Sequence, residues 1–127
     1  MKPKPRFTQD TLASIHKDRL LGIRAGSDSD HRVIGIWAVV VEGRVFVRSW
    51  SLKPRSWWRM FLEDPHGIIV VGTKEIPIRT VQTRSERLKD LVSAAYKEKY
   101  NKPGDIQYVK DMSRKKSKDT TTELVAN

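Results

Sequence analysis

The longest apolar run of the chain lies near its middle, over residues 34–41. Its nearly unbroken β-branched and apolar residues predict a strand that is buried on both faces. The Glu42–Gly43 pair then interrupts the run, and Gly43 can adopt a positive φ at little cost, so a tight hairpin turn is expected. A second strand is expected over 44–50.

Side chains alternate between two faces along this second strand. Val45 and Val47 share one face, and Phe46, Arg48 and Trp50 share the other. The first face resembles a protein core. The second mixes aromatic rings with a cation, which favours a site for a planar, phosphorylated ligand.

Helical patterns lie on both sides of this hairpin. Thr8 can cap a first helix, with Phe7 and Leu12 placed as a hydrophobic staple. A short strand over 21–25 follows. After the hairpin, a helix is predicted over 54–63, because proline in a first turn loses no hydrogen bond.

The second half of the chain predicts two strands, a long helix and a late strand. Residues 68–71 and 74–82 form the two strands, and Pro77 places the second of these at an edge or a bulge. Residues 83–86 match a capping box, so the long helix is expected to start there. Residues 114–118 are predicted to be a solvated basic loop, and 120–125 a late strand. The predicted apolar stripe of the helix comprises Leu88, Leu91, Val92, Ala95 and Tyr96.

This order of elements predicts an α+β fold, because consecutive hairpins favour an antiparallel barrel over a parallel sheet. We expect a split β-barrel of about six mostly antiparallel strands with flanking helices. Residues 1–7 are predicted to be a disordered basic N-terminus, and 8–127 a single domain. The expected core includes Trp37, Val39, Val45, Val47, Ile69, Ile78, Leu91 and Val92.

Charge and composition narrow the range of partners. Lys and Arg number 25 against 15 Asp and Glu, a formal net charge of +10, which favours anionic partners such as phosphorylated cofactors or nucleic acid. Solubility with a basic tail explains the charge equally well. The chain has no cysteine, no apolar stretch near the roughly 20 residues of a membrane span and no signal core after its basic start. A cytoplasmic protein is therefore expected.

No catalytic motif is readable in the chain. His16, His31 and His66 are far apart without metal-like spacing, so no metal site is expected. There is no phosphate-binding GxGxxG or Walker loop and no GxSxG nucleophile motif. If chemistry occurs, a bound cofactor must carry it.

A flavin-type cofactor is the ligand that the central residues suit best. Its phosphate needs cations and hydroxyls, and its ring needs an apolar slot with stacking partners. The candidate cofactor-binding residues are Arg48, Ser49, Trp50, Lys53, Arg55 and Trp58, with Trp57 as another stacking candidate. Two alternatives stay open: tryptophans in the core with solvated cations, or a non-enzymatic module that binds a phosphorylated ligand or, less favoured, nucleic acid.

Three strings carry a family resemblance: IWAVVVEGRVFVRSW, RSWWRMFLEDPHGIIVVG and LVSAAYKEKY. Together with residues 108–112 and 120–125, they resemble the uncharacterised bacterial family called domain of unknown function 2255. The likeness spans roughly Thr8 to Val125. That family implies no established activity.

A more distant resemblance is to the FMN-binding split barrels, which include pyridoxamine phosphate oxidase-like and deazaflavin-dependent nitroreductase-like proteins. It rests on Ile36-Trp37, Arg48-Ser49 and the segment Leu62-Glu63-Asp64-Pro65. It implies an oxidoreductase in which FMN or a deazaflavin moves a hydride. It further implies a homodimer, with the phosphate near the second hairpin strand and the helix that follows.

Overall fold

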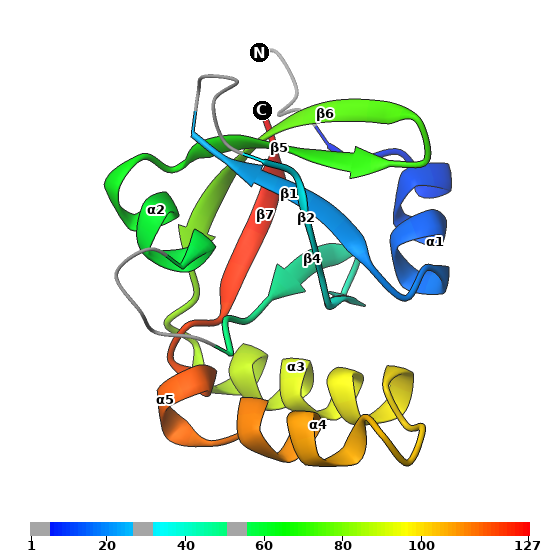
Figure 1. Ribbon diagram of the computed structural model, residues 1–127, viewed down its shortest axis with the longest axis vertical. Helices are drawn as coiled ribbons and strands as arrows, with labels where there is room; N and C mark the ends of the chain where they lie inside the picture. Colours follow the sequence, from blue (N-terminus) through cyan, green and yellow to red (C-terminus); the bar gives the residue numbers. More distant parts are fainter. Residues whose placement is uncertain (1–5, 27–31, 51–55) are drawn as a thin grey trace.

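The computed structural model describes residues 6–26, 32–50 and 56–127. The predicted disorder of residues 1–7 falls largely outside these ranges. Within them the chain forms seven strands and five helices (Figure 1). In chain order they are α1 (Gln9–Lys17), β1 (Leu21–Ala25), β2 (Ile34–Ile36), β3 (Ala38–Val41), β4 (Arg44–Val47), α2 (Trp57–Glu63), β5 (His66–Val71), β6 (Lys74–Gln82), α3 (Glu86–Lys99), α4 (Ile106–Met112), α5 (Lys115–Lys118) and β7 (Thr122–Ala126).

The strands form one antiparallel sheet that curls into a nearly closed barrel. Their order is β2-β1-β5-β6-β7-β4-β3. The two edge strands, β2 and β3, are consecutive in the chain and are joined only by Trp37. We call this junction the seam. The predicted α+β barrel is confirmed, with seven strands in place of about six.

The hairpin turn at residues 42–43 is confirmed, because Glu42 has φ 55° and Gly43 has φ 72°. Two positive φ values match the twist of the flanking strands β3 and β4. The single strand expected over 34–41 is wrong in one respect. The chain breaks at Trp37, since β2 pairs with β1 whereas β3 pairs with β4. As an edge strand, β2 is largely exposed and not buried on both faces.

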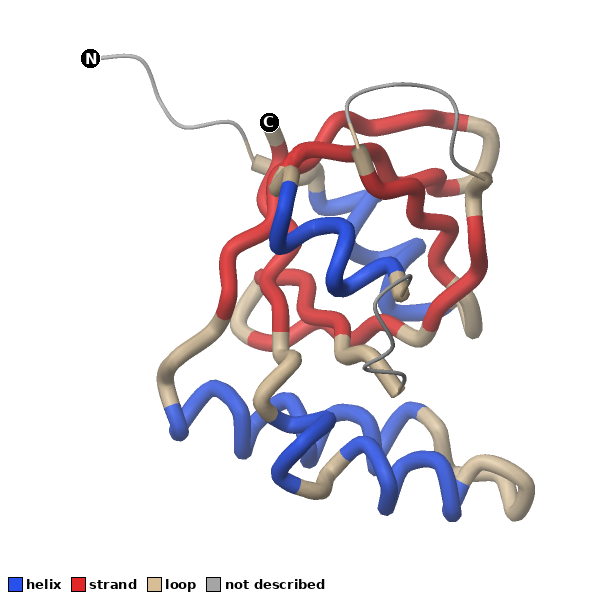
Figure 2. The backbone as a smooth tube through the Cα atoms, turned by 60° about the vertical axis from the view of Figure 1, so that its left-hand side comes forward, coloured by secondary structure: helices blue, strands red, loops and turns tan. Residues whose placement is uncertain are grey.

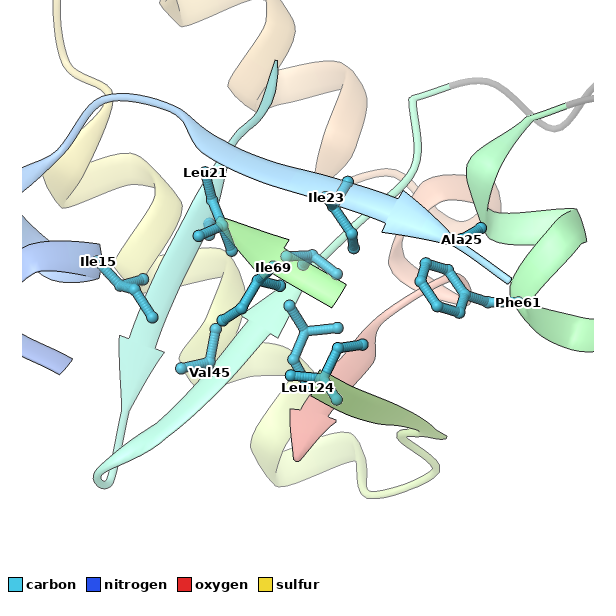
Figure 3. Close-up of a cluster of buried hydrophobic side chains, with 11 residues drawn as sticks. Ile15, Leu21, Ile23, Ala25, Val45, Phe61, Ile69 and Leu124 are labelled. Atoms are coloured by element: carbon cyan, nitrogen blue, oxygen red, sulfur yellow. The ribbon is translucent and has the colours of Figure 1, made fainter. Parts of the chain in front are cut away.

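The barrel interior holds the larger core cluster, as Figure 3 shows. Val45 and Val47 point into it, whereas Phe46 joins a second cluster between the sheet and the α3–α4 layer, so the predicted alternation is confirmed. The interior cluster comprises Ile15, Leu21, Ile23, Ala25, Ala38, Val45, Val47, Phe61, Ile69, Ile78 and Leu124.

Six of the eight expected core residues are buried, but Trp37 is half-buried and Leu91 is 38% exposed. The expectation for Leu91 is wrong because α3 turns a different face inward. Its buried residues are Leu88, Lys89, Val92 and Tyr96. Helices α4 and α5 pack beside α3 in Figures 1 and 2, and they help to cover the side that carries Lys89. Neither helix was predicted.

The helix starts are confirmed in part. Thr8 caps α1, and its hydroxyl accepts a hydrogen bond from the Thr11 amide at 3.1 Å. The cap of α3 is Ser85 and not Thr83, because the Thr83 amide still donates to the Thr121 carbonyl at 2.9 Å and extends the sheet pairing. Likewise α2 begins after Ser56, while the predicted start at residue 54 lies outside the described residues.

The C-terminal segment completes the barrel. The predicted late strand is confirmed as β7, which lies between β6 and β4. Strand β6 is therefore not an edge, contrary to expectation. Pro77 is tolerated because β7 pairs only as far as Ile78, and the Pro77 carbonyl accepts from the Asn127 amide at 3.1 Å just beyond it. The basic run forms the short helix α5 and not a solvated loop.

Candidate functional site

A pocket of about 660 Å³ opens beside the seam of the barrel. Its walls come from the seam, from the end of β4, from the start of α2 and from α4. We call it the seam pocket. It is lined by Leu20, Ile34, Gly35, Ile36, Trp37, Arg48, Ser49, Trp50, Ser56, Trp57, Tyr108 and Met112.

Trp37 is the most firmly placed ring of the pocket. It stacks on Tyr100 with 4.1 Å between ring centroids and an interplanar angle of 6°. The Arg19 guanidinium lies 5.5 Å from the Trp37 ring centroid, and Tyr108 meets the indole edge-on at 6.2 Å. These neighbours leave the indole little freedom to rotate.

Two tyrosine hydroxyls, one from α3 and one from its C-cap residue, bind the backbone around Trp37. The Tyr96 hydroxyl donates to the Trp37 carbonyl at 3.0 Å and accepts from the Arg48 amide at 3.0 Å. The Tyr100 hydroxyl donates to the Arg19 carbonyl at 2.7 Å and accepts from the Ala38 amide at 3.1 Å. These bonds satisfy backbone groups that the break between β2 and β3 leaves without sheet partners.

Both phenols are held in the neutral form. Burial raises the pKa of Tyr96 above its usual value, and it raises the pKa of Tyr100 to about 12. Each hydroxyl therefore keeps its proton near neutral pH and acts as donor and acceptor at once. The seam is consequently a rigid wall of the pocket.

Other lining residues of the pocket are aromatic and more open to solvent. Trp50 is 64% exposed and meets Tyr108 edge-on with 6.3 Å between centroids. Trp57 meets Phe61 in the same manner at 6.1 Å. A flat ring system entering the pocket would meet aromatic side chains among the lining residues.

Arg48 lies at the base of the pocket, with only 2% of its surface exposed. Its guanidinium donates to the Thr121 hydroxyl at 2.8 Å and to the Ser93 hydroxyl at 2.8 Å. It also donates to the carbonyls of Met112 at 3.0 Å and Lys89 at 2.7 Å. The local sequence offers no anion to pair with Arg48. Four neutral oxygens from distant segments bind its guanidinium instead.

Burial lowers the pKa of Arg48 from its usual value, while the nearby Tyr96 and Asp90 act in the opposite direction. An arginine pKa is normally so high that the group stays charged at neutral pH. The cation therefore joins α3, α4 and the residue before β7 to the end of β4. A contact between Arg48 and a phosphate stays a prediction.

The other predicted site residues are divided by the structure. Ser49 and Trp50 line the seam pocket with Arg48. Trp58 lies outside it: its indole nitrogen donates to Gln82 at 3.0 Å, and Arg59 covers its ring at 5.4 Å. Lys53 and Arg55 lie outside the described residues.

Several pocket residues were missed by the sequence analysis, including Tyr108 and Met112 of α4 and Leu20 ahead of β1. The α4 segment carries apolar residues at helical spacing, at 106, 109 and 112, and this signal could have revealed the helix. Within the described parts of the chain, no three His, Asp or Glu side chains gather as metal ligands would. None of the helices described is long and apolar enough to cross a membrane.

Fold and pocket together define a small α+β barrel with an aromatic pocket at its seam. The chain belongs to a family described as an uncharacterized protein conserved in bacteria (DUF2255), whose model matches residues 11–124. The family resemblance seen in the sequence is thereby confirmed.

Comparison with other proteins adds a likeness in fold. A crystal structure described as conserved hypothetical protein Rv2991 from Mycobacterium tuberculosis is similar, with a TM-score of 0.60 and 12% identity. The match covers 100% of this chain and 84% of that one. No curated protein matches the chain.

Proposed function

We propose that the seam pocket binds the ring system of a flavin or deazaflavin, and that the protein is an oxidoreductase using that cofactor. The observation that carries this proposal is the Trp37 ring, which is fixed by stacking on Tyr100 and faces a pocket of about 660 Å³. Pockets of this size with aromatic walls and few polar groups suit planar ligands.

The residues present fit the ring of such a cofactor better than its phosphate. Among the described lining residues Arg48 alone is charged, and it donates to four protein oxygens. The other hydroxyl-bearing side chains of the described lining are Ser49, Ser56 and Tyr108. Contacts of Lys53 and Arg55 with the phosphate stay a prediction from the sequence, because both lie outside the described residues.

A bound flavin or deazaflavin supplies the hydride chemistry, and the protein's own residues position it. Trp37 and Trp50 hold the ring, while Leu20 and Ile34 exclude water from the mouth. The exposed apolar side chains at this mouth are also surface that a second copy would cover, which supports a homodimer. Sedimentation at micromolar concentration tests the dimer, and a purely monomeric protein would refute it.

The test of the proposal is a calorimetric titration of the purified protein with FMN and with a deazaflavin. Trp50→Leu removes an exposed ring from the pocket wall, and the matched Trp58→Leu removes an indole outside it. We expect Trp50→Leu to weaken binding by about 0.5–1.5 kcal/mol, the contribution of one aromatic pair. Trp58→Leu should leave the affinity unchanged.

Failure to bind either cofactor would refute the proposal. An equal loss in both variants would show that the pocket is not the binding site.

A second candidate function is a non-enzymatic module for single-stranded nucleic acid. It is favoured by the exposed rings of Trp50 and Tyr108 on a chain of net charge +10. Titration with a short oligonucleotide distinguishes the two functions, because only nucleic-acid binding should weaken steeply with salt.

A further inference from the structure

A second cavity, of about 620 Å³, is lined by residues of α3, of α4 and of the segments that follow these helices. Figures 1 and 2 show these two helices side by side as a layer below the barrel. We call the cavity the helix groove. It is lined by Ser93, Ala94, Lys97, Tyr100, Asn101, Ile106, Val109, Lys110, Ser113 and Arg114.

The floor of the helix groove is apolar. Ala94 on α3 and Val109 on α4 contribute to it, and Ile106 is 48% exposed there. The lining residues within α3 (Ser93, Ala94, Lys97) and within α4 (Ile106, Val109, Lys110) repeat at spacings of three and four, so each helix contributes one stripe to the groove. Two such stripes side by side leave a channel that accepts a third helix.

The rim of the groove is positively charged and has no acidic residue. Lys97 stands on α3, whereas Lys110 and Arg114 stand on the α4 side. Among the described residues, neither lysine ammonium has a hydrogen bond or ion pair, and Arg114 reaches Asp111 only at 3.9 Å. By contrast, nearby Lys118 is paired with Asp90 at 2.6 Å.

We propose that the helix groove is a docking site for an acidic amphipathic helix of a partner protein. Such a helix would cover the floor with its apolar stripe. Acidic residues on both sides of that stripe would meet Lys97 on one rim and Lys110 with Arg114 on the other. The charge complementarity selects an acidic partner, and the apolar floor selects an amphipathic one.

The chemistry of the groove argues against two other anions. A compact phosphate would leave the apolar floor uncovered, since the cations stand on two different helices. Single-stranded nucleic acid needs exposed rings for stacking, but Tyr100, the one aromatic residue of the lining, is 2% exposed and already stacks on Trp37. An acidic amphipathic helix would pair with the basic residues of the rim and would also cover the apolar floor.

The test uses a fluorescent synthetic peptide of about 15 residues with one leucine stripe flanked on both sides by glutamate. Anisotropy titration with the full chain should show binding that weakens as salt is raised. The same peptide with lysine in place of glutamate should not bind. Equal binding of both peptides would overturn the proposal.

Charge variants locate the site. The double variant Lys110→Glu with Arg114→Glu should weaken binding about tenfold, because two attractive pairs become repulsive. Lys115→Glu with Lys116→Glu is the matched double control, since both lysines are exposed and outside the groove. A loss of the same size in the control would mean that only net charge matters and would refute the site.

The floor has its own matched pair of variants. Ile106→Ser should weaken peptide binding, whereas Leu91→Ser, at a comparably exposed position on α3 outside the groove, should not. Competition with inorganic phosphate and with an oligonucleotide completes the experiment. Displacement of the peptide by either at comparable concentration would overturn the choice of a protein partner.

Discussion

Replacing Arg48 with methionine tests whether this buried cation is structural. Methionine keeps most of the apolar stem but removes all four hydrogen bonds of the guanidinium, which reach α3, α4 and the residue before β7. We expect the variant to be strongly destabilised. The sequence-based hypothesis, in which Arg48 binds a phosphate, predicts instead that the fold persists and that ligand affinity falls.

The magnitude follows from the fates of three of the four acceptors. The Thr121 hydroxyl keeps its own bond to the Lys118 carbonyl, and the Lys89 carbonyl lies within α3. The Met112 carbonyl lies at the end of α4, where helix carbonyls have no partner within the helix. A hydrogen bond to a charged group contributes about 1.5–3 kcal/mol, but relief of the desolvated charge offsets part of the sum. We therefore expect the free energy of unfolding to fall by about 3–5 kcal/mol.

Urea denaturation followed by circular dichroism measures this loss. Arg87→Met is the control, because Arg87 forms an exposed pair with Glu42 at 2.9 Å and its removal should leave the free energy of unfolding nearly unchanged. Arg48→Lys should fall between wild type and Arg48→Met, since one ammonium cannot span all four acceptors. An Arg48→Met protein within about 1 kcal/mol of wild type would refute the structural role.

Three further changes test other parts of the fold. Tyr100→Phe removes two backbone hydrogen bonds at the seam, so the free energy of unfolding in urea should fall by about 1–3 kcal/mol; no change would contradict this. Arg19 lowers the pKa of Asp105 by hydrogen bonding. The ionised carboxylate therefore stabilises the fold above pH of about 4, and this stabilisation is lost as the pH falls through the lowered pKa. The melting temperature of wild type should therefore exceed that of Asp105→Asn at neutral pH, and a gap that persists in acid would contradict it. Gly67→Ala brings a β-carbon against a backbone oxygen of β1 and should cost at least about 2 kcal/mol, whereas Gly104→Ala meets nothing nearby and should be neutral in the same assay.

The candidate site was predictable only in its local part. The alternation along β4 correctly separated Val45 and Val47 from Phe46 and Arg48, because side-chain direction in a strand depends only on sequence parity. The oxygens that bind the Arg48 guanidinium lie 41 to 73 residues further along the chain. No local pattern could place them, so the sequence left the cation without a partner.

Trp50 and Trp58 likewise could not be told apart from the sequence. Both were predicted to bind the ligand because they lie close to cationic residues in the sequence. The direction of α2 turns Trp58 toward Gln82 on β6, while Trp50 remains at the pocket mouth. Helix direction relative to the barrel depends on packing between elements and not on residue spacing.

The sequence by itself determined the features that arise from interactions among near neighbours. These include the Thr8 cap, the tight turn at residues 42–43, the bounds of β6 and the antiparallel character of the sheet. Only the tertiary structure decided the break at Trp37, the exposure of Leu91 and the burial of Lys89. The chain breaks at Trp37 because the strands on either side of it, β2 and β3, lie at the two opposite edges of the curled sheet. The face of α3 is chosen by α4 and α5, whose packing is a long-range contact that no short window of residues contains.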